Sequence, residues 1–401
     1  WYPVDADGET VNDSPLVPDE SQLPIDPSTD VPAGYDESQR GKPNGFVGDP
    51  DVLDTWATSS LTPQIAGKWG DDDDLFARVY PYDVRPQGHD IIRTWLFSTV
   101  VRSHFEHGQA PWANAAMSGW ILDPDRKKMS KSKGNVVTPI DLFDSYGSDA
   151  VRYWAANARP GIDTAFSEDQ MKVGRKLAMK LLNVTKFVLG FGEVNAGTVP
   201  TEPIDVAMLK RLAGVVAEAT TAFENYDYAR SLERTESFFW WFCDDYVELV
   251  KSRAYATHSE EGAASARAAL ARALSTIQRL FAPILPFATE EVWSWWKEGS
   301  VHRAQWPTTA ELTDGTSGDA DDAFIEAVGG TIALIRRAKT EAKVSQRVAV
   351  EKAVVSGSPA AVAAIKAGWA DIADAGSVQS VEFVETNGDI TVDVTLAPPA
   401  E

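Results

Sequence analysis

The sequence contains very little cysteine. Cys243 is the one thiol among 401 residues, which excludes an intramolecular disulfide and any zinc site built from several cysteines. The neighbouring Asp244 and Asp245 are acidic, whereas a reactive thiolate needs an electropositive setting. We therefore expect a structural cysteine.

Long hydrophobic runs are also missing. No stretch of about 18 apolar residues exists that could cross a membrane, and residues 1–9 lack the basic and apolar regions of a signal peptide. With the lone cysteine, these absences indicate a cytoplasmic protein without membrane contact. The sequence does not start with Met, so we expect it to begin inside a longer protein or to have been cut from one.

Basic residues are scarce near the N-terminus. Residues 1–74 contain 17 Asp or Glu and 3 Lys or Arg, a net charge of −14 out of −22 for the whole chain. An excess of acid slows the approach of a polyanion such as nucleic acid, but it does not forbid a local basic path. Any site for phosphate must therefore lie in a local cluster of cations.

One such cluster is present between Arg126 and Lys133, where five of eight residues are basic. Ser130 and Ser132 lie between the lysines and Gly134 ends the run, a composition that disfavours a helix interior. Lysines supply charge, hydroxyls supply directed hydrogen bonds, and glycine lets backbone approach an anion. The pattern predicts a phosphate-binding loop; a solvated basic turn is the alternative.

The segment Lys128-Met-Ser-Lys-Ser132, continued by Lys133-Gly-Asn135, resembles the KMSKS signature of class I aminoacyl-tRNA synthetases without a mismatch. The resemblance implies that two lysines are catalytic, because they stabilise the β- and γ-phosphates of ATP as pyrophosphate leaves. These are Lys128 and Lys131. It also implies that five consecutive residues bind ATP, namely Lys128, Met129, Ser130, Lys131 and Ser132.

A second informative stretch precedes the loop. Residues 75–84 have a β-type composition, a turn follows at 85–90, and residues 91–101 form an apolar run typical of a helix. A strand, a glycine-containing turn and a helix start together form the place where a doubly wound sheet binds its ligand. Gly88 permits close backbone approach, and Asp90 either caps the helix or accepts hydrogen bonds from a ribose.

The block Gly88-His-Asp-Ile-Ile-x-x-Trp95 resembles that of the valyl-tRNA synthetases. The resemblance implies that Gly88 and Asp90 bind the ribose of ATP and that Ile91 and Trp95 border the amino-acid pocket. Positions i and i+4 share one helical face, although both side chains would equally suit a plain core. On a buried strand expected at 113–122, the family geometry would place Gly119 and Ile121 beside the adenine.

Helical periodicity dominates from Ser167 onward. Three apolar stripes at helical spacing predict a helical bundle: Leu177, Leu181, Val184 and Val188; Phe238, Phe239, Phe242, Tyr246 and Leu249; Leu270, Leu274, Ile277 and Phe281. A further helix is expected from Thr289, after Pro283 and Pro286.

Four residues outside the apolar stripes are candidates for tRNA contact. Lys172, Arg175 and Lys186 lie roughly opposite the first stripe, where they could follow a tRNA backbone or simply be solvated. Trp240 points away from the second stripe, and it could pack on another helix or stack on an unpaired anticodon base. For metal, His104 and His107 lack a third ligand, so we expect a surface pair and no tightly bound metal.

The predicted fold class is α/β followed by all-α. The expected parts are the second half of a class I Rossmann-like nucleotide-binding domain with its KMSKS loop, a stem-contact element, a helical anticodon-binding domain and a small C-terminal α/β module. We expect the chain to divide into an extended insertion at 1–50, the catalytic part at 51–136, the stem-contact element at 137–166, the helical domain at 167–307, a linker at 308–321 and the module at 322–401.

Taken together, the chain resembles the C-terminal part of the valyl-tRNA synthetases from Trp1 to about residue 345. The resemblance implies ATP-dependent activation of valine and its transfer to tRNA(Val), with Mg²⁺ arriving on ATP, in a monomer. The family's His-Ile-Gly-His motif and editing domain are not in this sequence, so we expect the chain alone not to activate valine. Alternatives are an isoleucyl-type enzyme, another nucleotidyl-transferring enzyme of the superfamily, and a non-catalytic tRNA-binding module.

Overall fold

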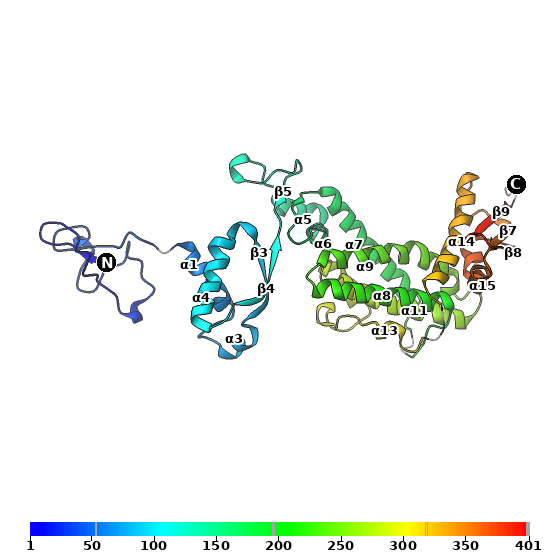
Figure 1. The fold of residues 1–401 in the computed structure, drawn as a ribbon, viewed down its shortest axis with the longest axis horizontal. Coiled ribbons are helices and arrows are strands. Elements are labelled where there is room, and N and C mark those ends of the chain that lie inside the picture. The colour runs from blue at the N-terminus through cyan, green and yellow to red at the C-terminus, as the bar shows by residue number, and fades with distance from the viewer. Residues whose placement is uncertain (53, 195–196, 317, 319, 398–401) are drawn as a thin grey trace. The chain divides into compact units, whose positions relative to one another are not determined.

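The computed structural model describes residues 1–397 except 53, 195–196, 317 and 319, and it describes the backbone but not the side chain of Lys131. The chain divides into two compact units, unit 1 (Trp1–Ala116) and unit 2 (Met117–Glu401) (Figure 1). Across the described part of the chain, no helix has the length and apolarity needed to span a membrane.

The first 50 residues of unit 1 are held together by backbone hydrogen bonds in turns and by side chains. The indole Nε1 of Trp1 donates to the carbonyl oxygens of Pro27 and Asp30 at 3.1 and 3.0 Å, and Phe46 is fully buried. The regular elements are very short: β1 (Tyr2–Pro3), antiparallel to β2 (Phe46–Val47), and the 3₁₀ turns η1 (Glu20–Gln22) and η2 (Glu37–Gln39). This proline-rich segment is therefore extended, as expected, but it is folded and has a buried side chain at Phe46.

The rest of unit 1 consists of short helices and a two-stranded sheet: α1 (Thr55–Ser59), α2 (Thr62–Ala66), α3 (Asp73–Val79), β3 (Tyr82–Gly88), η3 (His89–Ile91), η4 (Ile92–Leu96), α4 (Phe97–His107) and β4 (Trp112–Ser118). The predicted β-type run at 75–84 is wrong for its first half, which is helical. The carboxylate of Asp72 accepts from the Leu75 backbone N–H, and acidic residues in the first turn stabilise a helix start.

The expected buried strand at 113–122 is also wrong. It is two strands, β4 and β5 (Ile121–Leu122), and most of β4 is partly or fully exposed. Its partner is β3, and a sheet of two strands has too few neighbours to bury both faces. Burial of this strand therefore cannot be read from its small and apolar residues alone.

Unit 2 begins with β5, which pairs in parallel with β6 (Thr164–Ala165). Two helices, α5 (Ile140–Tyr146) and α6 (Ser148–Ala156), are separated at Gly147, where φ is 86° and favours glycine. Among the described residues, no side chain caps the start of α6. Asp149 instead accepts from the backbone N–H groups of Phe287 and Ala288, at 3.2 and 2.7 Å, in the first turn of α12 (Pro286–Ser294).

A bundle of long helices forms the core of unit 2: α7 (Glu168–Leu189), α8 (Pro203–Glu224), α9 (Tyr228–Trp241), η6 (Phe242–Tyr246), α10 (Val247–Ala254), α11 (Glu260–Phe281) and α12. Figure 1 shows α7, α8, α9 and α11 lying side by side, and their buried side chains belong to one cluster. All three predicted apolar stripes are buried in that cluster. The helix expected from Thr289 begins earlier, at Pro286.

Helix α8 is the element that periodicity missed. Its apolar residues occur nearly all around the helix, and half of its positions are buried. A helix packed on several sides has no single stripe for a period of 3.6 to reveal. It lies centrally, in contact with α9, α11, α13 (Ala310–Thr313) and α14 (Asp322–Glu341).

The C-terminal part differs from the predicted linker and separate module. Within 308–321, α13 packs on α8 and buries Leu312 completely. After η7 (Val301–Arg303) and α13 the elements are α14, β7 (Val350–Gly357), α15 (Pro359–Ala367), α16 (Trp369–Gly376), β8 (Val381–Glu385) and β9 (Thr391–Leu396), with sheet order β8-β7-β9. Their apolar side chains join the bundle's core cluster.

A buried ion network links this tail to the bundle. The guanidinium of Arg253 on α10 pairs with Asp205 on α8 at 2.8 Å and with Asp371 on α16 at 2.9 Å. Burial alone would lower the pKa of Arg253, but hydrogen bonds and charges from both carboxylates raise it. A second buried cation, Lys339 on α14, donates to the carbonyl oxygens of Gln346 and Gly376.

Candidate functional site

The Lys128–Ser132 motif lies on the loop between β5 and α5 in unit 2. A tight turn precedes it, in which the Arg126 N–H donates to the Asp123 carbonyl and the Asp123 N–H donates to the Lys127 carbonyl, both at 2.9 Å. Lys128 then bridges back to Leu122. The turn therefore returns the chain beside β5 and starts the motif at the end of a strand.

Two side chains outside the motif brace the loop. The Asn135 amide Nδ2 donates to Asp123 Oδ2 at 2.8 Å, and its Oδ1 accepts from the Ser130 N–H at 3.0 Å. Asp123 also accepts from the Lys127 N–H at 2.8 Å. The Lys127 N–H and the Asn135 amide hold the pKa of Asp123 below its usual value. The two ends of the loop are thus joined by a carboxylate–amide pair.

The motif residues themselves face solvent to different degrees. Lys128 and Ser132 are exposed, whereas Met129 and Ser130 are half-buried. The hydroxyls of Ser130 and Ser132 lie 3.2 Å apart, close enough to share one anionic oxygen. The Lys131 backbone begins the short turn η5 (Lys131–Lys133), and its side chain lies outside what the structure describes. An exposed lysine and two adjacent hydroxyls suit a phosphate chain.

The strand before the loop carries the predicted adenine contacts. A Cβ on Gly119 would come within 2.2 Å of the backbone carbonyl of Ile162, so glycine is required for the close approach of these two backbones. Ile121 is 51% exposed, which is unusual for a strand residue and leaves its side chain free to contact a ring. The adenine role of both residues stays a prediction.

In unit 1, the predicted ribose residues lie where β3 ends. Gly88 directly precedes η3, and a Cβ there would come within 2.7 Å of the Asp90 carboxylate. Asp90 is exposed and lies in the first turn of η3, and no side chain caps that turn. Asp90 therefore does not cap this turn, and its contact with the ribose stays a prediction.

The predicted amino-acid pocket residues have different surroundings. Trp95 is buried, stacks on Trp112 with centroids 5.8 Å apart, and donates its Nε1 to the Ser59 carbonyl at 2.6 Å. The Arg85 guanidinium lies 4.0 Å from its ring centroid. Ile91 ends a 3₁₀ turn and Trp95 lies in a π-helical turn, so the single α-helical face expected from i,i+4 spacing is wrong. The pocket role stays a prediction.

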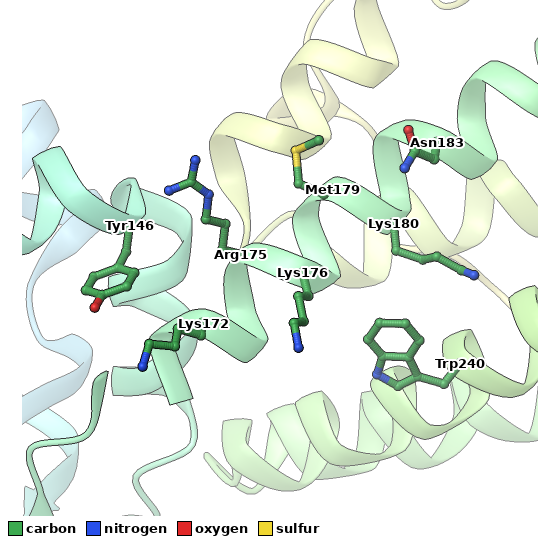
Figure 2. Close-up of a pocket in the computed structure, with 8 residues that line it drawn as sticks. All are labelled: Tyr146, Lys172, Arg175, Lys176, Met179, Lys180, Asn183 and Trp240. Carbon is green, nitrogen blue, oxygen red and sulfur yellow. The ribbon is translucent and has the colours of Figure 1, made fainter. Parts of the chain in front are cut away.

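Three of the four predicted tRNA residues line one groove in unit 2 (Figure 2). The groove has a volume of about 620 Å³ and is lined by Tyr146, Lys172, Arg175, Lys176, Met179, Lys180, Asn183 and Trp240. Figure 2 shows the cations extending from α7, with Trp240 projecting from α9 on the facing side. Lys186 is not among the lining residues; its ammonium lies 5.7 Å from the Trp295 ring centroid.

The four groove cations differ in how they are paired. Lys172 pairs with Asp169 at 2.9 Å and Lys180 with Asp244 at 2.7 Å, and these carboxylates raise the pKa of each lysine. One Arg175 nitrogen donates to the Ser145 carbonyl. Lys176 makes no ion pair or side-chain hydrogen bond with any described residue. Lys176 is therefore the cation most available to an anion.

Trp240 has the geometry of an aromatic platform. It is half-buried, and its Nε1 donates to Glu236 Oε1 at 3.0 Å. The ring packs partly against the core cluster of the bundle, as one of the two expectations had it, and it also lines the groove. An aromatic face beside several cations is the combination by which proteins hold single-stranded or looped RNA.

Sequence reasoning missed four residues of these two sites. Asp123 and Asn135 brace the loop, and Lys176 and Lys180 line the groove. Lys176 and Lys180 follow Lys172 at intervals of four, so the i,i+4 rule would have found them. The Asp123–Asn135 pair carries no such signal, because 12 residues separate its members.

Comparison with known proteins gives the family. A family model described as "tRNA synthetases class I (I, L, M and V)" matches residues 29–167, and one described as "Anticodon-binding domain of tRNA ligase" matches residues 205–354. The valine–tRNA ligase of Thermobifida fusca (strain YX) is 59% identical over 402 residues, which cover 99% of this chain and 45% of that protein. The chain belongs to the valine–tRNA ligase family.

Other members agree with this assignment. The valine–tRNA ligase of Salinispora arenicola (strain CNS-205) is 56% identical over 99% of this chain and 48% of its own length. The chain thus spans about half the length of the valine–tRNA ligases it matches. The anticodon-binding match crosses the predicted linker and enters β7, in line with the shared core of the bundle and tail.

A solved structure shares the fold at lower identity. The LeuRS of Agrobacterium radiobacter K84, described as a ternary complex with tRNA and LeuAMS, aligns with a TM-score of 0.56 and 21% identity. The alignment covers 67% of this chain and 35% of that one. At this identity the likeness supports the class I synthetase architecture and no finer statement.

Proposed function

We propose that this chain supplies the phosphate-binding loop and the tRNA-binding bundle of a valine–tRNA ligase. In the first step, a valine carboxylate oxygen attacks the α-phosphorus of ATP and pyrophosphate leaves. In the second, the valyl group passes from the adenylate to a hydroxyl at the 3′ end of tRNA(Val). The observation that carries the proposal is an intact KMSKS segment on a braced, exposed loop in a member of this family.

The loop acts by electrostatics and needs no protein nucleophile. Negative charge builds up on the β- and γ-phosphates as the α–β bond breaks, and Lys128 and Lys131 stabilise it. The Ser130 and Ser132 hydroxyls, 3.2 Å apart, donate hydrogen bonds to phosphate oxygens. Mg²⁺ enters with ATP as part of the substrate; a cluster of three or more His, Cys, Asp or Glu suited to metal does not occur among the described residues.

The remaining predicted contacts orient ATP and valine. The exposed carboxylate of Asp90, next to Gly88, accepts hydrogen bonds from the ribose hydroxyls. Gly119 and Ile121 lie along the adenine, and Met129 completes the ATP-binding segment. Ile91 and Trp95 border the valine side chain, with Trp95 held by Trp112 and the Ser59 carbonyl. A rigid aromatic wall favours a small branched side chain over larger ones.

The groove of unit 2 binds tRNA in this proposal. Lys172, Arg175, Lys176 and Lys180 neutralise phosphates along one stretch of backbone, and Trp240 stacks on an unpaired base or ribose. Lys186 extends the same helix face toward the C-terminal end of α7. The positive groove offsets, locally, the net charge of −22 on the chain.

A chimeric enzyme tests the proposal. This chain replaces the 402 matching residues of the Thermobifida fusca enzyme, and valine-dependent ATP–pyrophosphate exchange and tRNA(Val) charging are measured. We expect both activities, and we expect Lys128→Ala and Lys131→Ala to lower the exchange rate by at least about tenfold each. Exchange that is unchanged in both variants would overturn the catalytic assignment.

The chimera also separates the rival functions. Isoleucine-dependent exchange would favour isoleucyl specificity. Loss of exchange together with intact tRNA binding would favour a tRNA-binding module. We further propose that the complete enzyme is a cytoplasmic monomer, which size-exclusion chromatography of the chimera and cell fractionation of its source would test.

A further inference from the structure

Lys128, the first lysine of the motif, does not extend freely into solvent. Its ammonium nitrogen lies 3.5 Å from the centroid of the Trp120 ring. A cation within about 6 Å of an indole face is held by the ring quadrupole, and tryptophan is the strongest such partner. The short distance in an exposed loop indicates a preferred position of this side chain.

The backbone of Trp120 is anchored outside the loop. Its backbone N–H donates to Asp163 Oδ1 at 2.8 Å, and its carbonyl accepts from the Thr164 N–H at 2.9 Å. The preceding Gly119 lies against the backbone of Ile162. The backbone that carries the indole is therefore tied to the segment from Ile162 to Thr164, which fixes where the Trp120 side chain starts.

We propose that Trp120 is a positioning residue that holds Lys128 in a resting orientation and releases it to the phosphates of ATP. This inference rests on the proposed function of the loop. An ammonium over the ring face has to leave the indole to reach a β- or γ-phosphate. A charge-assisted bond to phosphate is stronger than a cation–π contact at an exposed site, so the exchange proceeds when ATP is present.

The loop's braces allow this exchange without a rearranged backbone. Asp123 and Asn135 fix both ends of the loop and the Ser130 N–H. Rotation about the four-carbon stem of Lys128 is then sufficient to move the charge. In the resting state the indole competes with anions for the Lys128 ammonium. The contact therefore weakens the binding of pyrophosphate and other polyphosphates.

The test uses the full chain labelled with ¹³C in lysine alone. The Lys128 Hε–Cε signal is assigned by its loss in Lys128→Arg. We expect this signal to be displaced by the ring current of Trp120, to return to the ordinary lysine position in Trp120→Leu, and to stay displaced in Trp120→Phe, which keeps an aromatic face. Lys297, whose ammonium lies 4.3 Å from the Trp296 ring centroid, is the matched control. Its signal should change in Trp296→Leu and stay unchanged in both Trp120 variants.

Pyrophosphate is then titrated into each variant. We expect it to move the Lys128 signal to a new position and to leave the Lys297 signal unchanged. Because the resting contact competes with binding, Trp120→Leu should bind pyrophosphate about two- to fivefold more tightly than the parent chain. Trp120→Phe should lie between the two, a ranking that a purely structural role of Trp120 would not produce.

The outcomes distinguish failure of this inference from failure of the proposed function. An undisplaced Lys128 signal in the parent chain, or equal pyrophosphate affinity of the parent and Trp120→Leu, overturns the inference and leaves the loop's phosphate role standing. Absence of pyrophosphate binding in both overturns the release step and also removes support from the proposed function. A signal that fails to move with bound pyrophosphate overturns the release step.

Discussion

Removing positive charge from the groove should weaken tRNA binding by an amount that depends on salt. Each phosphate that a lysine or arginine neutralises adds about 0.7–0.9 to the slope of log K against log salt concentration. A fourfold rise in salt therefore lowers the affinity by about 2.6- to 3.5-fold per contact. Lys176 makes no ion pair with any residue that the structure describes. Its neutralisation of one phosphate should therefore contribute the whole of this slope.

The paired lysines should contribute less. Lys180 must leave Asp244, which lies 2.7 Å away, before it can bind a phosphate. We expect Lys176→Ala to reduce the slope by about 1, Lys176→Ala with Arg175→Ala by about 2, and Lys180→Ala by less than Lys176→Ala. Trp240→Ala should lower affinity by about 1–3 kcal/mol with an unchanged slope, because stacking releases no counterions.

Fluorescence anisotropy of labelled tRNA(Val) with this chain, at several KCl concentrations, measures these slopes. Lys352→Ala is the charge-matched control, since Lys352 lies on β7 in a pair with Glu382 at 2.6 Å. Its slope should equal that of the parent chain. The reasoning is refuted if Lys176→Ala and the double variant keep the parent slope, or if Lys352→Ala lowers it equally.

Three further predictions concern the fold and the loop. Asp205→Ala leaves the buried Arg253 charge partly unpaired and should lower the free energy of unfolding by about 3–5 kcal/mol in a urea titration, whereas Glu341→Ala, which breaks an exposed pair, should cost at most about 1 kcal/mol. Arg126 has a φ of 63°, so Arg126→Gly should raise the free energy of unfolding by up to about 1 kcal/mol; a loss would contradict the turn geometry. The pKa of Asp123 is lowered in the folded chain, so its bracing is fully present above the ordinary value of ~3.9 and is lost as the pH falls through the folded value. The protection factor of the Ser130 amide, which corrects the exchange rate for its intrinsic pH dependence, should then fall at acid pH, and it should fall at neutral pH in Asp123→Asn.

The buried thiol matches its sequence-based expectation. Cys243 is 3% exposed, and burial raises its pKa to about 12. Acidic neighbours in the sequence predicted low reactivity, and burial in the bundle adds to it, since both disfavour the thiolate. We expect thiol-specific reagents to modify the folded chain much more slowly than the chain unfolded in urea.

The elements that sequence reasoning predicted well are those with one dominant signal. The stripe Leu177, Leu181, Val184 and Val188 has one buried face, and α7 follows from it. By contrast, α8 has apolar residues on most sides, so its sequence shows no clear helical period. The first half of the strand expected at 75–84 is instead part of helix α3, which Asp72 caps.

The candidate site divides in the same way. The KMSKS segment is recognisable because its chemistry is contained in five consecutive residues. The cations of the groove follow a helical interval, and three of four residues proposed for tRNA contact line one groove. The α-helical spacing misled for Ile91 and Trp95, because a 3₁₀ turn and a π-helical turn replace the regular helix there.

Consecutive residues and regular spacing were enough to recognise the KMSKS segment, the helical character of the second half and the family resemblance. Folding in three dimensions was needed to pair Asp149 with the start of α12, Arg253 with Asp205 and Asp371, Asn135 with Asp123, and Lys128 with the face of Trp120. The physical reason is that hydrogen bonds and ion pairs act over a few ångströms, and no local pattern says which distant polar groups the packing of apolar faces will bring that close.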